Sequence, residues 1–226
     1  MIFPQCEIFS ATNAQEILFV AGGRVPSVDW FKSVAASRKI FCVDKGIELC
    51  RACEIVPNFL IGDFDSAQNS DVDWAREKNI LVEKYPADKD FTDTQLALHR
   101  AAEIFGEHTA ILTGCFGGRF DHIYSTIFTC ASINRKIFLA DEHEIIFFVK
   151  GGESVDVKFF KKPRAVSLLP MSEICAGVST KNLHWELDAA TLTQNFPNAT
   201  SNRIEAEKIS VSVERGRLAV YFCFAE

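Results

Sequence analysis

The sequence lacks a hydrophobic run long enough to cross a membrane, since its longest apolar stretches have only the length of β-strands. Its first residues, MIFPQCEIFSATNAQE, also lack the basic start and the apolar stretch of a signal peptide. We therefore expect neither an export signal nor a membrane anchor, and no membrane partner.

Positive charge is in deficit, with 24 Lys and Arg residues against 30 Asp and Glu residues and a net charge of -6. This balance argues against nucleic acid or an anionic membrane as the main partner. A nucleotide stays compatible with it, because local basic groups, glycine amides and a bound cation can outweigh the average field. The 48% hydrophobic content is enough for a buried core in one large domain or two small ones.

The eight cysteines do not form a recognisable metal motif. Cys50 and Cys53 have the spacing of a zinc or redox pair, but no second such pair or His pair completes a tetrahedral site. They would share one helical face with Ile47, which favours core packing. Without an export signal, the cysteines indicate reduced thiols and a cytoplasmic protein.

The first part of the chain, residues 1–142, alternates strand-like apolar runs with helix-like segments. This rhythm predicts an α/β domain with a parallel sheet and crossover helices, whose ligands bind beyond the carboxyl ends of the strands. The nearly continuous apolar character predicts strands covered on both faces. The runs are EILFVAGG, KIFCVDKG, NFLIGDFDS, ILVEKYP, TAILTGCFGG and KIFLADE.

The clearest helix is predicted in TDTQLALHRAAEIFG. Thr92 and Gln95 have the spacing of a capping box, and Gly106 can end the helix. Its predicted apolar stripe consists of Ala97, Ala101, Ile104 and Phe105.

Residues 143–226 change to an alternating pattern and predict an all-β sandwich. The last segment, ISVSVERGRLAVYFCF, reads as two strands joined at Arg215-Gly216. No internal repeat or low-complexity linker appears, so this boundary depends only on the change of period.

Two carboxylates, Asp63 and Asp65, directly follow the predicted strand NFLI. At the ligand-binding edge of a sheet they would repel each other, and a bound Mg²⁺ would relieve that repulsion and face phosphate oxygens. The alternative is an acidic turn that caps the next helix.

A second acidic group, Asp88, Asp90 and Asp93, lies before the capped helix, where Asp90 and Asp93 could also serve capping and the helix dipole. A third segment, GCFGGRFDH from Gly114 to His122, again follows a strand. Its glycines would let the backbone approach an anion, and Arg119 could bind phosphate as a fork. Three such clusters at successive strand ends indicate a metal-phosphate site.

These residues resemble the thiamine pyrophosphokinase family. The resemblance spans nearly the whole chain and depends most on three motifs, IGDFDS, the helix that begins TDTQ, and GGRFDH. Weaker matches, in family order with these, are VDKG at Asp44, SLLP, GVSTKNLHW and TSN at Thr200 to Asn202.

The resemblance implies an α/β catalytic domain followed by a thiamine-binding β-sandwich, in a homodimer whose sites form at the subunit interface. It implies transfer of the diphosphate of ATP to the hydroxyl of thiamine, giving thiamine diphosphate and AMP. The residues it implies are Asp63, Asp65 and Asp93 for Mg²⁺ and catalysis, Asp121 for catalysis, Asp44, Gly117, Gly118, Arg119 and Asn202 for ATP, and Ser179 and Trp185 for thiamine.

Some features depart from the family or allow another reading. Lys45-Gly46 replaces the usual glycine pair after Asp44, and Asn182 replaces a glycine, although Asn tolerates left-handed backbone angles. Trp185 could stack on the thiazolium cation or simply fill the sandwich core. Asp93 or Asp121 could accept the hydroxyl proton, and for His122 we favour a structural role at a helix start.

Two other functions compete with the kinase. Asp63 could be the covalent nucleophile of a haloacid-dehalogenase-type phosphatase. However, the further Lys and acidic motifs of that class do not occur in the required order in this sequence. The chain could also be a non-catalytic nucleotide-binding regulator.

Overall fold

The computed structural model describes residues 1–9, 14–64 and 69–225, which form two compact units. One unit is Ala14–Asp141. The other combines Met1–Asn13 with Glu142–Glu226. Within the described residues, no helix has the length and apolar character needed to span a bilayer.

The Ala14–Asp141 unit contains the predicted parallel sheet, in the strand order β7-β6-β2-β3-β4-β5. All the runs predicted from the sequence form strands. They are β2 (Glu16–Val20), β3 (Lys39–Val43), β4 (Phe59–Gly62), β5 (Leu81–Lys84), β6 (Thr109–Thr113) and β7 (Ile137–Ala140).

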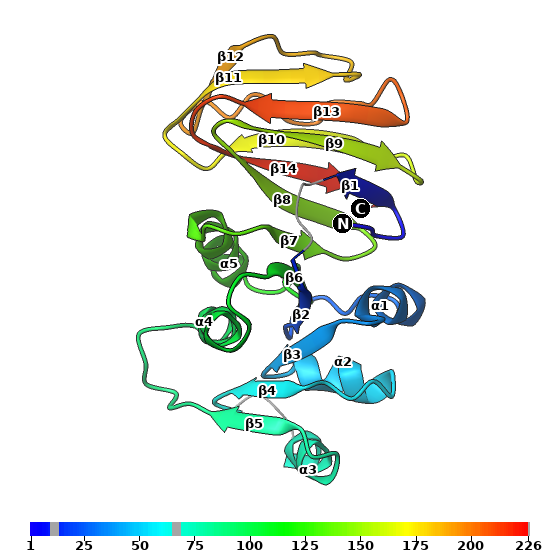
Figure 1. The fold of residues 1–226 in the computed structure, drawn as a ribbon, viewed down its shortest axis with the longest axis vertical. Coiled ribbons are helices and arrows are strands. Elements are labelled where there is room, and N and C mark those ends of the chain that lie inside the picture. The colour runs from blue at the N-terminus through cyan, green and yellow to red at the C-terminus, as the bar shows by residue number, and fades with distance from the viewer. Residues whose placement is uncertain (10–13, 65–68, 226) are drawn as a thin grey trace. The chain divides into compact units, whose positions relative to one another are not determined.

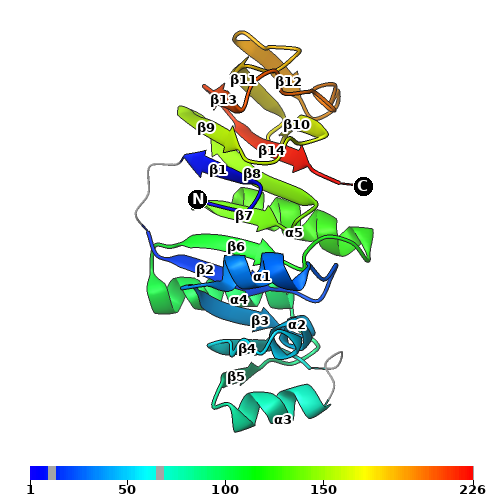
Figure 2. The same cartoon turned by 90° about the vertical axis from the view of Figure 1, so that its right-hand side faces the viewer.

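Helices cover both faces of this sheet, as the continuous apolar character of the strands predicts. Figure 1 shows α1, α2 and α3 along one face and α4 and α5 along the other. In Figure 2, α1 and α2 lie in front of the sheet and α4 lies behind it. The helices are α1 (Val28–Ala35), α2 (Gly46–Ala52), α3 (Asn69–Glu77), α4 (Asp93–Phe105) and α5 (Phe120–Ser132).

The strand order reverses between β2 and β6. The chain proceeds outward from β2 to β5 and then returns to place β6 on the other side of β2. In open α/β sheets, ligands bind at such a switch point, outside the carboxyl ends of the strands. The loops after β2 and β6 therefore flank the position where a ligand is expected.

Helix α4 confirms its predicted ends. The Thr92 hydroxyl accepts from the Gln95 amide at 3.3 Å, the Gln95 side chain accepts from the Thr92 amide at 2.9 Å, and Gly106 is the C-cap with φ 61°. The predicted stripe is only partly buried: Ala97 and Ala101 are buried, but Ile104 is 40% exposed. Phe105 is half-buried, and its ring packs edge-on against Phe41 of β3 and Phe59 of β4, with centroids 6.1 and 6.3 Å apart, so the last turn meets the sheet through Phe105 and not through Ile104.

Helix α2 confirms the packing role of the cysteines, since Ile47, Cys50 and Cys53 are all buried. The Sγ atoms of Cys42 on β3 and Cys50 lie 3.3 Å apart as thiols. Among the described residues, no group of three His, Cys, Asp or Glu side chains is arranged to hold a metal ion.

The other unit consists of antiparallel strands in two sets, as the alternating pattern predicts. One set has the order β1-β9-β13-β11-β12, and the other includes β10-β14-β8. Phe159 of β9 packs edge-on against Phe222 of β14, with ring centroids 5.0 Å apart. The strands are β1 (Cys6–Phe9), β8 (Glu144–Lys150), β9 (Glu153–Phe159), β10 (Ala165–Pro170), β11 (Ile174–Lys181), β12 (Ala190–Thr193), β13 (Lys208–Val213) and β14 (Arg217–Cys223).

The division between the units differs from the predicted 1–142 and 143–226. The N-terminal strand β1 pairs with β9, with Cys6 opposite Phe159, and so belongs with the sandwich. Cys6 and Ile8 are buried there, while Glu7 and Phe9 are not, which is the alternation of a strand with one covered face. A change of period at one point in the chain could not reveal this long-range pairing.

The last two strands, β13 and β14, do not form a simple hairpin, because they do not pair with each other. β13 pairs with β9 and β11, whereas β14 pairs with β8 and β10, so the turn at Arg215-Gly216 carries the chain from one sheet to the other. The predicted alternation itself is confirmed, because Ile209, Val211 and Val213 are buried, as are Leu218, Val220, Phe222 and Phe224.

Candidate active site

A pocket of about 710 Å³ opens at the carboxyl edge of the parallel sheet, at the predicted switch point. Loops that follow β2, β3, β4 and β6 line it, together with the segment that leads into α4. Its walls include many of the residues predicted from the sequence, namely Asp44, Asp63, Asp93, Gly117, Gly118 and Arg119.

Two glycine loops form one side of this pocket. The Gly23 amide donates to the Gly114 carbonyl at 2.6 Å, and the Arg24 amide donates to the Phe116 carbonyl at 2.6 Å. A Cβ atom on Gly114 would lie 2.2 Å from the Ala21 carbonyl oxygen, so the approach requires glycine. The role of the loop after β2 was not predicted, although the glycines of AGG directly after a strand were a visible signal.

Gly117 and Gly118 follow in the same loop, with φ 71° and 73°. Two successive left-handed residues are favourable only for glycine. Gly117 packs against Arg24, since a Cβ atom there would lie 3.1 Å from the Arg24 Cβ. Arg24 itself forms an ion pair with buried Asp141, at 2.6 Å. This ion pair fixes the position of Arg24, against which Gly117 packs.

Asp44 follows β3 in a left-handed conformation, with φ 45°. The loop after β4 folds closely around its carboxylate: Oδ1 lies 3.4 Å from the Phe64 amide, and a Cβ atom on Gly62 would come within 1.8 Å of it. Burial, and then the nearby carboxylates Asp93 and Asp63, raise the pKa of Asp44 to about 7. Asp44, which only the family resemblance had suggested, therefore interacts with Asp63 and Asp93 in the folded chain.

Lys89 lies among these carboxylates and was missed in the sequence analysis. Its Nζ is 3.1 Å from Asp93 Oδ1 and 3.6 Å from Asp63 Oδ2. The signal was present as the Lys between the acidic residues Asp88 and Asp90. The predicted metal residue Asp65 lies outside the described residues.

The donor atoms present suit a hard divalent cation. Oδ1 of Asp93 is buried and has no well-directed hydrogen-bond donor in the described part of the chain, although the ammonium of Lys89 is close to it. Mg²⁺ prefers oxygen ligands and commonly binds through one or two carboxylates together with substrate phosphates. Asp63 and Asp93 therefore fit such an ion.

Arg119 and Asp121 lie at the start of α5 and bind each other. Arg119 donates through Nε to Asp121 Oδ1 at 3.1 Å and through Nη2 to Oδ2 at 2.6 Å. Both side chains are exposed, at 74% and 59%. The hydrogen bonds from Arg119 are the main cause that lowers the pKa of Asp121.

The other predicted residues lie in the sandwich unit. The indole of Trp185 is 57% exposed, which excludes the alternative that it fills the core. The guanidinium of Arg203 lies over its ring, 5.4 Å from the centroid. The ring is thus available to a planar or cationic partner.

Asn202 supports the Trp185 loop. Its Oδ1 accepts from the Trp185 amide at 3.1 Å, and its Nδ2 donates to the Trp185 carbonyl at 2.8 Å. Ser179 accepts from the Ala189 amide at 2.9 Å. Asn182 has φ 63°, which confirms that Asn there takes the left-handed conformation that a glycine would have.

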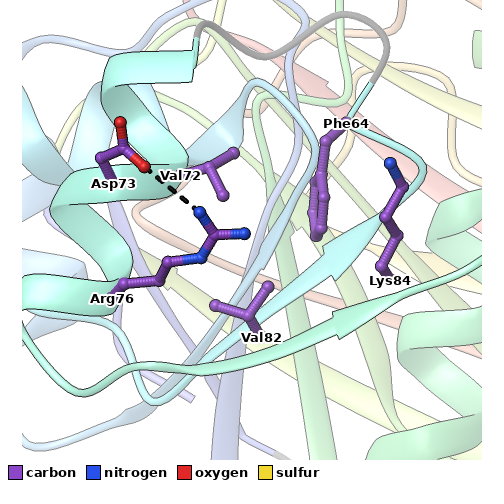
Figure 3. Close-up of a pocket in the computed structure, with 6 residues that line it drawn as sticks. All are labelled: Phe64, Val72, Asp73, Arg76, Val82 and Lys84. Carbon is purple, nitrogen blue, oxygen red and sulfur yellow. Dashed lines mark hydrogen bonds and ion pairs between the residues drawn. The ribbon is translucent and has the colours of Figure 1, made fainter.

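A second pocket, of about 620 Å³, lies between α3 and the β4–β5 edge of the sheet (Figure 3). Its charged groups do not converge on one point: Arg76 pairs with Asp73 at 3.2 Å, and both are largely exposed. The described residues that line it are Phe64, Val72, Asp73, Arg76, Val82 and Lys84, and none of these six was predicted for catalysis or binding.

Comparisons with known proteins agree with this geometry. The family model of the thiamin pyrophosphokinase catalytic domain matches residues 31–139, and that of the thiamin pyrophosphokinase vitamin B1 binding domain matches residues 154–218. Thiamine pyrophosphokinase of Bacillus subtilis (strain 168) is 28% identical over 179 residues, which are 78% of this chain and 83% of the relative.

Solved structures show the same fold. The crystal structure of thiamine pyrophosphokinase from Bacillus subtilis matches with a TM-score of 0.82 and 24% identity, over 94% of this chain and 100% of the other. That of a thiamin pyrophosphokinase family protein from Enterococcus faecalis matches with a TM-score of 0.81 and 22% identity, over the same shares. The chain belongs to the thiamine pyrophosphokinase family, whose reaction transfers the diphosphate group of ATP to thiamine.

Proposed function

We propose that this chain carries out the family reaction in the pocket at the carboxyl edge of its parallel sheet, with ATP and Mg²⁺ bound there. The observation that carries the proposal is the convergence of Asp44, Asp63 and Asp93 next to two interlocked glycine loops. Carboxylates for a metal and glycine amides for phosphate are the two components that such a transfer requires.

The glycine loop after β6 and Arg119 bind the polyphosphate in this proposal. Gly117 and Gly118 keep side chains away from the backbone, so that phosphate oxygens can approach its amides. Arg119 is exposed and exchanges its bidentate contact with Asp121 for one with phosphate. Asp44 and Asn202 are the further predicted ATP ligands.

Asp63, Asp65 and Asp93 would hold Mg²⁺. When bound, the ion would neutralise the charge of the transferred diphosphate. Alignment and charge stabilisation account for most of the catalysis of phosphoryl transfer, so no histidine is required. Of the two candidates for the proton acceptor, Asp93 fits better, because its side chain lines the pocket, whereas the lining among the described residues does not include Asp121.

Thiamine binds on the sandwich unit in this proposal, at Ser179 and Trp185. The vitamin B1 binding family model covers both residues. The exposed indole already attracts one cation, Arg203, and a thiazolium ring has both the charge and the planarity that favour such a contact.

We further propose a homodimer in which one subunit contributes Asp63, Asp65 and Asp93 and the other contributes Trp185. Large exposed aromatic side chains occur on both units: Trp185 on the sandwich, and Phe120, Tyr124 and Phe128 along α5. The rings of Tyr124 and Phe128 lie 4.5 Å apart and form a continuous aromatic surface. Exposed aromatic groups are enriched at protein interfaces.

Mixed dimers test this arrangement. Asp63→Asn and Trp185→Ala proteins, each inactive or weakened, are mixed after dissociation and allowed to reassociate. Random pairing makes about half of the dimers mixed, so roughly a quarter of all sites should be intact. If native mass spectrometry confirms mixed dimers and no activity returns, Asp63 and Trp185 do not share a site across subunits.

The eight reduced thiols support action in the cytoplasm, where thiols stay reduced. The function itself is tested by incubation with ATP, Mg²⁺ and thiamine. We expect AMP formation that depends strictly on thiamine. Phosphate release without thiamine would indicate a phosphatase instead, and nucleotide binding without turnover would indicate a regulator.

A further inference from the structure

The ammonium group of Lys89 occupies the centre of the carboxylate cluster. It contacts Asp93 Oδ1 at 3.1 Å, Asp63 Oδ2 at 3.6 Å and the Pro86 carbonyl oxygen at 2.9 Å. The ammonium donates a hydrogen bond to the Pro86 carbonyl oxygen, and its contacts with the two carboxylates are ion pairs. The side chain is therefore held from three directions, two of which are proposed metal ligands.

Burial makes this contact stronger than a surface ion pair. The side chains of Lys89, Asp63 and Asp93 are 14%, 21% and 17% exposed. Ionised carboxylates brought together out of water repel strongly unless a cation lies between them. Lys89 forms an ion pair with both Asp63 and Asp93.

The position of Lys89 in the chain lets it move without unfolding an element. It lies in the segment between β5 and α4, four residues before Asp93, and its side chain lines the pocket. A lysine ammonium is a compact charge on a flexible stem, in contrast with the planar fork of arginine. It can leave two carboxylates and reach a phosphate oxygen by changes in side-chain torsions alone.

We propose that Lys89 is a built-in counter-cation of this site: it holds Asp63 and Asp93 together before the metal binds, and its ammonium transfers to the nucleotide phosphates when Mg²⁺ takes over the two carboxylates. Lys89 is thus a positioning residue for the carboxylates and a ligand of the polyphosphate. This inference rests on the proposed function of the pocket.

The proposal predicts that Lys89 competes with a divalent cation in the nucleotide-free protein. An opposite charge within about 4–6 Å of a carboxylate changes its affinity for a competing cation by roughly tenfold or more. Lys89→Met should therefore bind Mn²⁺ alone at least about tenfold more tightly than the wild type, as measured by the electron paramagnetic resonance signal of free Mn²⁺.

The same variant should bind the nucleotide less well. A charge-assisted hydrogen bond to phosphate corresponds to roughly ten- to a hundredfold in affinity, so the KM for Mg-ATP should rise by at least about tenfold. Lys89→Arg retains the charge and should keep Mn²⁺ affinity close to that of the wild type. A merely structural lysine would instead leave the Mn²⁺ affinity unchanged or lowered in Lys89→Met.

Two controls make the outcomes distinct. Lys84→Met makes the same change in net charge on the neighbouring strand β5 and lines the other pocket, so its Mn²⁺ affinity should stay at the wild-type value. Asp63→Asn should abolish the tight Mn²⁺ site. If it does not, the proposed metal site is wrong, and the role of Lys89 is wrong with it.

If Asp63→Asn abolishes Mn²⁺ binding but Lys89→Met binds Mn²⁺ no more tightly than the wild type, the metal site stands and the inference about Lys89 is overturned. Lys89→Gln, which keeps a polar side chain of similar length, replaces Lys89→Met in the same measurement if that protein does not fold. Equal Mn²⁺ affinity of Lys89→Gln and the wild type overturns the inference equally.

Discussion

The two edges of the parallel sheet differ in how their polar side chains are paired. At the carboxyl edge, Asp44, Asp63 and Asp93 are brought close together, and Asp93 Oδ1 is buried without a well-directed donor from the residues that the structure describes. At the amino edge, buried His108 lies between the Gly106 carbonyl oxygen at 2.9 Å and Arg135 Nη1 at 3.0 Å.

Other groups at the amino edge are matched in the same manner. Arg38, just before β3, pairs with Glu16 at the start of β2 at 2.6 Å. Asn58, just before β4, accepts from the Ile40 amide at 2.9 Å. One edge thus satisfies its polar groups within the chain, while the other leaves interactions for a ligand to complete. The difference indicates that the amino edge contributes stability and the carboxyl edge contributes function.

The largest effect should come from the carboxyl edge. Asp63→Asn and Asp65→Asn should each nearly abolish turnover, by about a hundredfold or more, because each removes a charge that would hold the metal. Melting temperature should stay near the wild-type value. The exposed Asp73→Asn serves as the matched control. Near-normal kcat at saturating Mg²⁺ in either variant would exclude this metal site.

Trp185→Ala asks whether function extends beyond the sheet edge to the sandwich. A stacked aromatic contact contributes about 1–3 kcal/mol, so the apparent affinity for thiamine should fall roughly tenfold or more, with a smaller effect on ATP. Trp185→Phe keeps a ring and should lose less. If the affinity for ATP changes and the affinity for thiamine does not, the proposed contact between Trp185 and thiamine is wrong.

Thr92→Ala tests a residue that has a stabilising contact at the functional edge. The loss of the N-cap hydrogen bond to Gln95 should lower the free energy of unfolding by about 1 kcal/mol. Turnover should fall as well, because Asp93 is the first residue of the helix. Thr92→Ser retains the hydroxyl and should restore both quantities in denaturant titration and AMP assays. Unchanged stability in Thr92→Ala would contradict the energetic role of this cap.

The smallest effect should come from pH at the amino edge. Burial, together with Arg135, lowers the pKa of His108 below its usual value near 6.5, so the unfolded chain binds the proton more readily. The stabilising contribution is complete above about pH 6.5 and is lost as pH falls below it. Melting temperature should therefore fall on acidification more in the wild type than in His108→Gln.

The contribution of Asp44 to the pH dependence of stability has the opposite sign. Because the pKa of Asp44 is raised to about 7, the folded chain binds this proton more readily than the unfolded chain at pH values between the usual Asp pKa and about 7. Because both the wild type and His108→Gln contain Asp44, its contribution cancels when their melting temperatures are compared at each pH. His184→Gln, at an exposed histidine, should follow the wild type. Equal acid sensitivity of the wild type and His108→Gln would show that His108 is not the responsible group.

Local patterns account for what could be predicted. The six parallel strands, the capping box of α4 and the buried alternation of β13 and β14 all follow from residues that are neighbours in sequence. The meeting of Asp63, Asp93 and the glycine loop after β6 in one pocket was also predictable, because the carboxyl ends of parallel strands lie at one edge, whereas Asp44 was expected only from the family resemblance. The pairing of β1 with β9 and the passage of the chain between sheets at Arg215-Gly216 were not, since both depend on distant partners.

The sequence by itself determined the kind of chemistry, because carboxylates, glycines and an arginine at successive strand ends can serve few purposes other than metal and phosphate binding. Only the tertiary structure decided how these groups interact. It raised the pKa of Asp44 through burial and two neighbouring carboxylates, paired Arg119 with Asp121, exposed Trp185, and placed Lys89 between Asp63 and Asp93. These are properties of distance and burial, which the order of residues in a chain does not contain.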